Sequence, residues 1–315
     1  MTTPAPKARK GSGSRADARF QAVIVGLASI VLVTALAYSV VLLLNGASAF
    51  GREGLGFVFG SNWDPANGHF QAFPFIAGTF FTALGALVIA VPLALAASLF
   101  IAEYAPDWLA NPIAYLVELL AAIPSVVYGL WGIFVLIPAT LPVQKWLVSL
   151  FQIKNASGEL YSPVGPGLFS AMLILAIMII PFISAISRDV IKLVPTDQRE
   201  AAYGLGATKW EVIRYAILPY ARAGILGGVI LGLGRAIGET LAVTMVIGNA
   251  NRFPQNLLSP TATMSSIIAS NFGEAGTPEF VSSLIGIGFV LFVVSLIVNF
   301  LARIVIAKLT PQGTS

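Results

Sequence analysis

Three features are missing or scarce in this chain of 315 residues, and each excludes a class of function. Cysteine is absent, which excludes disulfides, thiolate nucleophiles and cysteine–zinc sites. The single histidine, His69, cannot build a histidine metal cage or a histidine proton relay. A G-x-x-x-x-G-K-[S/T] loop is also missing, so the chain cannot bind ATP through a P-loop. Energy for its function, if needed, must come from a partner or from an ion gradient.

Charged residues are scarce as well. They make up 10% of the chain, whereas apolar residues make up 57%, and an ordinary soluble domain has roughly 25% charged residues. The mean hydropathy is +0.86. A soluble globule could not hide so much apolar surface, and a disordered chain needs low hydrophobicity and high net charge. The composition therefore excludes a soluble enzyme and predicts a polytopic membrane protein.

Six stretches are long and apolar enough to cross a bilayer, since a spanning helix needs about 20 mostly apolar residues. They are Phe20–Leu44, Phe73–Ile101, Ile113–Pro138, Gly167–Ser187, Ala216–Ile247 and Val281–Ala307. No alternating β-barrel pattern is present, so the predicted fold class is an all-α membrane protein with six transmembrane helices. The first stretch has a basic flank and ends near Ala47-Ser48-Ala49, as a signal peptide does. Its apolar run exceeds the about 7–15 residues of a signal core, which favours a retained helix.

The positions of Lys and Arg predict the orientation of the chain. Thirteen of the eighteen lie in or near the N-terminal tail, the loop of about 188–215 and the C-terminal end. Both termini and that loop are therefore predicted to be cytoplasmic, with 1–19 as a tail and 20–315 as the transmembrane domain. The segments of about 45–72, 139–166 and 248–280 are predicted to face outward. Because no aromatic–basic groove accompanies the positive charge, nucleic-acid binding is not expected.

The cytoplasmic loop has the local signals of a helix, a glycine turn and a second helix. Thr196 can cap the first helix, which Gly204 and Gly206 would end. Thr208 and Glu211 then have the spacing of a capping box. Small residues leave a surface that another protein could approach closely: Ala201, Ala202, Gly204 and Gly206. On this pattern alone, a stiff connector between two spans explains the loop equally well.

The same loop resembles the EAA loop of ABC-importer permeases. The resemblance rests on Glu200-Ala201-Ala202, on Gly206 and on Leu218-Pro219. The residue two before the Leu-Pro pair is usually aliphatic in that family and is Ala216 here, a small departure. The family's loop is a coupling helix that sits in a groove of a cytoplasmic ATPase. The resemblance therefore implies that Glu200, Ala201, Ala202 and Gly206 couple the chain to an ATPase, and that the six helices adopt the type I importer fold.

More narrowly, four stretches resemble permease subunits of bacterial phosphate importers: Gly60–Pro65, Phe73–Thr79, Gly206–Arg214 and Leu233–Asn249. The resemblance covers most of the chain after about residue 20. It implies a multi-pass subunit of the inner membrane that is not an enzyme and carries no cofactor. It also implies partners: a homologous permease, a dimer of ABC ATPases, a periplasmic or extracellular phosphate-binding protein, and inorganic phosphate as cargo.

Other interpretations stay open at this point. The same machine could carry another oxyanion, such as sulfate or molybdate. A gradient-driven anion carrier, with Glu239 relaying protons, would belong to a different class and would need no ATPase. A purely regulatory membrane scaffold is a third alternative.

Arg235 and Glu239 are ionisable residues near the middle of the fifth span, where charge is unfavourable and usually faces a cavity or a partner. Their spacing predicts one helical face, which Gly224, Gly228 and Gly232 continue. The planar guanidinium suits phosphate oxygens, and the carboxylate could accept the proton of a monohydrogen phosphate. Both are therefore candidate residues of the substrate path. The alternative is that the two charges only neutralise each other and lock two helices together.

Overall fold

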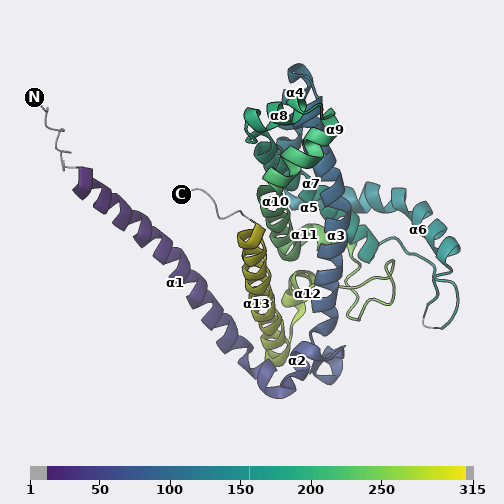
Figure 1. Cartoon of the computed structure of the whole chain (residues 1–315). Helices are drawn as coiled ribbons and strands as arrows, with labels where there is room; N and C mark the ends of the chain where they lie inside the picture. The colour runs from purple at the N-terminus through teal and green to yellow at the C-terminus, as the bar shows by residue number, and fades with distance from the viewer. Residues whose placement is uncertain (1–12, 156, 310–315) are drawn as a thin grey trace, which may run out of the picture.

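The computed structural model describes residues 13–155 and 157–309, and most of them are helical (Figure 1). The first twelve residues of the predicted tail lie outside this range. The helices and strands, in chain order, are α1 Gly13–Glu53, α2 Gly56–Phe59, β1 Trp63–Asp64, η1 Pro65–Asn67, β2 His69–Phe70, α3 Phe73–Leu99, η2 Phe100–Tyr104, α4 Asp107–Ala122, α5 Ser125–Trp131, η3 Gly132–Leu136, α6 Ile137–Phe151, α7 Leu168–Lys192, α8 Thr196–Gly204, α9 Lys209–Val212, η4 Ile213–Ile217, α10 Leu218–Gly238, α11 Leu241–Val246, α12 Met264–Asn271, η5 Phe272–Glu274 and α13 Pro278–Leu309.

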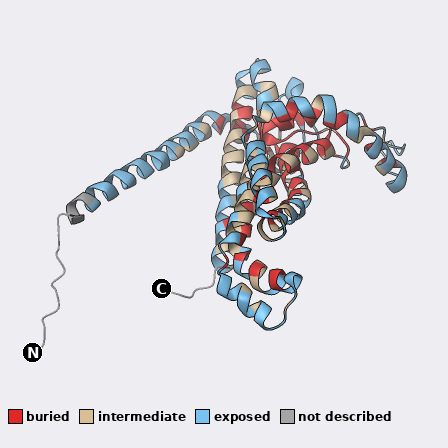
Figure 2. Cartoon of the chain, turned by 90° about the horizontal axis from the view of Figure 1, so that it is seen from above, coloured by how far each residue is buried: buried red, intermediate tan, exposed pale blue. Residues whose placement is uncertain are grey.

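Six helical segments of the described chain are long and apolar enough to cross a membrane, which confirms the predicted number. They are Asp17–Glu53, Phe73–Tyr104, Ser125–Phe151, Leu168–Lys192, Lys209–Gly238 and Pro278–Lys308. The segment of α7 is 61% buried within its most apolar window, whereas that of α1 is 0% buried. Figure 2 shows the same contrast between the exposed α1 and the buried centre of the bundle. The fold is therefore built around α7, and α1 offers its apolar surface to lipid or to another membrane protein.

The first helix meets the bundle at its C-terminal end and leans away from it along the rest of its length (Figure 1). Gly46 packs against Gly286 of α13 so closely that a Cβ at Gly46 would lie 2.9 Å from the Gly286 Cα. Beside this contact the Ser48 hydroxyl donates to the Ser282 Oγ at 2.6 Å. Small residues thus let α1 and α13 approach closely at one point, as in other membrane helix pairs.

The predicted third span, Ile113–Pro138, is wrong in its position. Helix α4 ends at Ala122, and Ile123 and Pro124 have extended backbone with ψ of 129° and 140°. A proline disfavours helical geometry in the residue before it, so Pro124 breaks the helix at Ile123. The apolar span runs from Ser125 to Phe151 instead, and α6 extends into the segment that was predicted to face outward.

Three π-helical turns share one sequence feature. Each of η2, η3 and η4 is followed, after one intervening residue, by a proline: Pro106, Pro138 and Pro219. In each case the intervening residue donates its N–H to the carbonyl five residues back, as Leu218 does to Ile213. A proline has no N–H for the carbonyl four residues back, and its ring crowds that carbonyl. Widening the preceding turn to π geometry relieves both problems.

Glycines on α10 let it pack closely against α7, as their spacing predicted. A Cβ at Gly224 would lie 2.5 Å from the Val190 Cγ2 of α7, and one at Gly232 would lie 2.9 Å from the Ile183 Cγ1. At Gly228 the nearest atoms also belong to α7. These contacts leave no room for side chains at the crossing.

Gly224→Ala is therefore expected to destabilise the purified chain in detergent by about 1–3 kcal/mol, because the stiff Val190 side chain cannot move aside freely. Gly227→Ala is the matched control, since a Cβ there has no atom within 4 Å. It should be neutral or stabilising by up to about 1 kcal/mol through helix propensity. Thermal unfolding of both variants checks this, and equal melting temperatures would contradict the close packing at Gly224.

A small hairpin of β1 and β2 precedes the N-terminal end of α3, and in it Trp63 pairs with Phe70 and Asp64 with His69. Trp63 packs its ring edge-on against Phe70 and Phe75, with centroids 5.3 and 4.9 Å away. At the turn, the Asn67 side-chain amide donates to Asp64, which lowers the pKa of that carboxyl. The hairpin thus anchors the loop between α2 and α3 against the bundle.

Candidate functional site

The fifth predicted span is interrupted within the candidate site. Helix α10 ends at Gly238, Glu239 has extended backbone with a ψ of 127°, and α11 begins at Leu241. Gly238 has no side chain to favour the helix, and the Glu239 carboxylate accepts the N–H of Ala242 at 3.3 Å, within the first turn of α11. The prediction of a continuous helix over Ala216–Ile247 is therefore wrong. The predicted alignment of Arg235 and Glu239 on one helical face is wrong for the same reason.

Arg235 lies in the last turn of α10 and is half-buried against α7. Its guanidinium carbon sits 4.5 Å from the ring centroid of Phe182, a cation–π contact. Its Nε is buried and has no hydrogen-bond partner, and the ion pairs within 4.0 Å found in the described part of the chain do not include one with Glu239. The two charges therefore do not neutralise each other by contact. A guanidinium with an unmet donor in a membrane span is suited to an anionic ligand.

Glu239 is buried, and it lies where three segments distant in sequence meet. Its backbone carbonyl accepts the hydroxyl of Ser265, the second residue of α12, at 2.7 Å. Thr263 caps α12, and the N–H of Met264 donates to the Thr79 Oγ1 of α3 at 2.9 Å. The break after α10 is thus held in a polar cluster formed by α3, α10 and α12.

The position of α12 was not foreseen from the sequence. Within residues 248–280, which were predicted to face outward, Met264, Ser265, Ser266 and Ile267 belong to a buried helix. Figure 1 shows α12 between α3 and α13, which it contacts. The capping-box spacing of Thr263 and Ser266, ahead of Ile267 and Ile268, was the sequence signal that could have identified this helix.

The coupling segment, defined here as Thr196–Val212, has the predicted form of helix, glycine turn and helix. Gly206 adopts a φ of +83°, a conformation that favours glycine. Thr208 and Glu211 form the predicted capping box. The predicted cap at Thr196 is wrong: Pro195 takes the capping position, and Thr196 is the first residue of α8.

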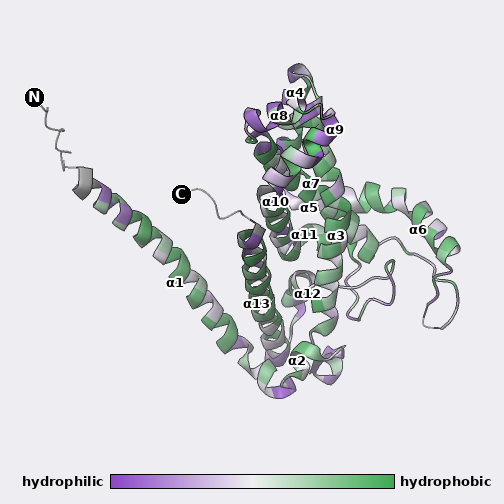
Figure 3. Ribbon diagram, viewed as in Figure 1, coloured by the Kyte–Doolittle hydropathy of each residue, from purple (hydrophilic) through white to green (hydrophobic). Residues whose placement is uncertain are grey.

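The exposed surface of the coupling segment includes large apolar side chains among polar ones. Glu200 and Ala201 are exposed, whereas Ala202 packs against the core between α7, η4 and α10. Leu205, in the turn, is 90% exposed, and Tyr203 and Trp210 beside it are also exposed. Figure 3 shows that this end of the molecule is otherwise among its more hydrophilic parts. These large side chains in a polar loop were not singled out from the sequence, and they mark a surface that another protein would cover.

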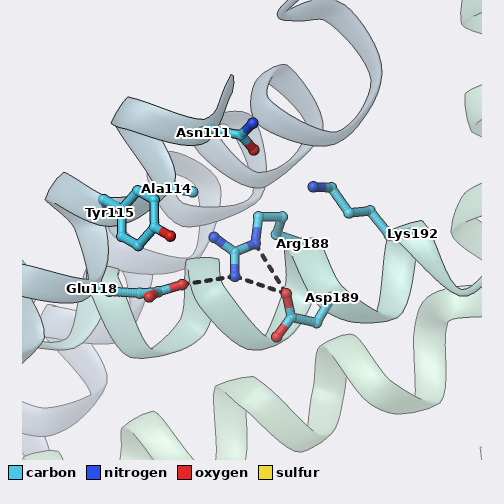
Figure 4. Close-up of a pocket in the computed structure, with 7 residues that line it drawn as sticks. All are labelled: Asn111, Ala114, Tyr115, Glu118, Arg188, Asp189 and Lys192. Carbon is cyan, nitrogen blue, oxygen red and sulfur yellow. Dashed lines mark hydrogen bonds and ion pairs between the residues drawn. The ribbon is translucent and has the colours of Figure 1, made fainter. Parts of the chain in front are cut away.

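A cavity of about 400 Å³ opens near the same end, between α4 and α7 (Figure 4). Its lining is Asn111, Ala114, Tyr115, Glu118, Arg188, Asp189 and Lys192. The Arg188 guanidinium bridges the two helices, donating to Glu118 at 2.9 Å and to Asp189 at 2.8 Å. The positive charges of Arg188 and Lys192 balance the negative charges of Glu118 and Asp189 in this lining. The cavity is therefore polar but has no net positive charge that would hold an anion.

Comparisons with known proteins agree with this arrangement. The model of the family described as "Binding-protein-dependent transport system inner membrane component" matches residues 90–311. The phosphate transport system permease protein PstC of Xylella fastidiosa (strain 9a5c) is 42% identical over 98% of this chain and 96% of its own length. PstC of Haemophilus influenzae (strain ATCC 51907 / DSM 11121 / KW20 / Rd) is 44% identical over 90% of each chain.

Solved structures share the fold at lower identity. A chain of the bacterial alginate ABC transporter, in complex with its alginate pentasaccharide-bound periplasmic protein, superposes with a TM-score of 0.61 at 17% identity. That match covers 95% of this chain and 98% of the other. Six apolar spans, the coupling segment and these relatives lead to one conclusion. The chain belongs to the family of binding-protein-dependent transport system inner membrane components, the multi-pass permeases of ABC importers.

Proposed function

We propose that this chain is a permease subunit of an ATP-driven phosphate importer and forms half of the translocation path. The observation that carries the proposal is Arg235, whose guanidinium has an unmet, buried donor at the break between α10 and α11. Relatives named as phosphate transport permeases support phosphate as the anion. The planar donors of Arg235 can bind two phosphate oxygens at once, which a lysine cannot do.

The proposed assembly has four kinds of subunit. A PstA-like permease would supply the other half of the path, and two copies of a PstB-like ATPase would supply the energy that this chain cannot obtain for itself. A PstS-like binding protein would deliver phosphate from the outer side. The exposed side chains of Leu205, Tyr203 and Trp210 support an ATPase contact at the coupling segment, because an exposed leucine is unfavourable there until a partner covers it.

The orientation in this proposal follows from charge. The end that carries α8, α9 and the cavity at Arg188 also carries the basic loop, so it is placed in the cytoplasm together with both termini. The aromatic hairpin of β1 and β2 then lies outside, where a binding protein docks.

The proposed mechanism is alternating access. ATP-driven closure of the ATPases displaces the coupling segment, and the spans reorient around the break at Glu239. Arg235 binds the anion with its donors, while the nearby Glu239 carboxylate limits how tightly the anion is held, which passage requires. Because the Glu239 carboxylate also accepts the N–H of Ala242 in the first turn of α11, a change at this carboxylate would affect the start of that helix.

Uptake of radiolabelled phosphate into proteoliposomes tests the proposal. The complex, co-expressed with its ATPase and second permease, should import phosphate only with ATP and binding protein present. Unlabelled sulfate or molybdate should compete weakly. Strong competition by either would indicate another oxyanion importer. Uptake that persists without ATP and collapses with an uncoupler would indicate a gradient-driven carrier and would contradict the proposal.

A further inference from the structure

Arg199 connects the coupling segment to two membrane-spanning helices. Its Nη1 donates to the Glu103 Oε1 of η2, at the end of α3, at 2.6 Å. Its Nη2 donates to the carbonyl of Ile191 in α7 at 2.8 Å, and its Nε lies 3.4 Å from the carbonyl of Val194. One side chain from α8 therefore holds the ends of both α3 and α7.

The contact is largely shielded from water. The side chains of Arg199 and Glu103 are 21% and 9% exposed. Ionised donors and acceptors form stronger and more directional hydrogen bonds than neutral ones, and burial reduces their screening. The positive charge also lies at the C-terminal end of α7, where the helix dipole favours a cation. Because the fork of the guanidinium serves three acceptors at once, a lysine could not reproduce it.

A second contact joins the coupling segment to η2. The Lys209 Nζ of α9 lies 4.4 Å from the ring centroid of Tyr104, the neighbour of Glu103 in η2. The coupling segment also continues into α10 through η4, which is a π-helical turn like η2. Both spans therefore reach the coupling segment through a widened turn, and such turns are frequent at functional sites.

We propose that Arg199 is a positioning residue that transmits displacement of the coupling segment to α3, through Glu103, and to α7, through the carbonyls at its end. The role rests on the proposed function, because it presupposes an ATPase that moves this segment. Without the contact, α8 would move while the ends of α3 and α7 stayed behind. ATP would then be hydrolysed without reorienting the path.

The test measures phosphate imported per ATP hydrolysed in proteoliposomes that hold the full complex. Arg199→Lys keeps the charge but loses the fork, so this ratio is expected to fall about fivefold or more while assembly and ATP hydrolysis are retained. Arg214→Lys is the matched control, because Arg214 is an exposed cation of the adjacent η4 whose contact is the ring of Tyr215. It should keep the wild-type ratio.

Glu103→Gln provides a second, gentler variant, because the amide keeps the volume and an acceptor oxygen. Its ratio should also fall, whereas Asp107→Asn, an exposed neighbour, should not change it. In the Arg199→Lys/Glu103→Gln double variant, the ratio should fall no further than in the more affected single variant. Both substitutions interrupt the same Arg199–Glu103 contact, so their effects should not add.

The outcomes separate the two proposals. A wild-type ratio in both single variants would overturn the role of Arg199 and leave the proposed function intact. If Arg199→Lys does not assemble, the ratio of Glu103→Gln decides alone. A wild-type complex that hydrolyses ATP but imports no phosphate would overturn the proposed function and this role together.

Discussion

Arg235→Lys is expected to reduce phosphate uptake by about tenfold or more, because the ammonium keeps the charge but loses the planar fork. Assembly with the ATPase should be unchanged, since Arg235 makes no ion pair within 4.0 Å in the described part of the chain. Phosphate uptake and co-purification with the ATPase, measured on one preparation, check the expected loss of transport and the expected retention of assembly. Arg252→Lys is the control, because Arg252 is exposed in a loop between α11 and α12.

Replacing Arg235 and Glu239 together by leucine separates a path from a packing role. Removing both ionisable groups avoids leaving one buried charge alone, so assembly should survive. If the two residues serve the path, the assembled double variant should import no phosphate. Normal uptake in the assembled complex would contradict the assignment of both residues. Glu239→Gln keeps an oxygen for the Ala242 N–H, so it should assemble and change the pH dependence or the substrate preference of uptake.

Gly206→Val is expected to abolish most ATP-driven uptake while membrane insertion is retained. The φ of +83° at Gly206 disfavours residues with a Cβ by about 1–2 kcal/mol, and a β-branched residue is among the least tolerant. Because no atom lies within 4 Å of a Cβ at this position, the effect comes from the backbone alone. Uptake and ATP hydrolysis of the reconstituted complex check it.

Gly206→Asn is the matched control for that prediction, because asparagine tolerates the left-handed conformation far better than valine. It should retain most of the uptake. Equal uptake in both variants would show that the turn tolerates rearrangement and that the coupling segment acts only as a connector. Loss in both variants would indicate a requirement for the small size of glycine at the ATPase contact.

Local signals explain which predictions were confirmed. Scarce charge and long apolar runs are properties of composition, so the membrane class and the number of spans followed from them directly. The turn at Gly206 and the capping box of Thr208 and Glu211 depend on residues at most a few positions apart. Close packing at Gly224 and Gly232 followed from their spacing, because small residues on one face of a membrane helix favour the approach of another helix.

By itself, the sequence determined the membrane class, the number of spans and the form of the coupling segment, because hydropathy, caps and glycine turns act over short distances. Only the tertiary structure decided where the fifth span ends, because the break at Glu239 is stabilised by Ser265 of α12, far away in sequence. It also decided the partner of Arg235, which is Phe182 and not Glu239. Arg199 looked like one more cation of a basic loop, and its contact with Glu103, nearly one hundred residues earlier, appears only in the packed structure. Such contacts arise when helices pack against each other, and no local pattern records them.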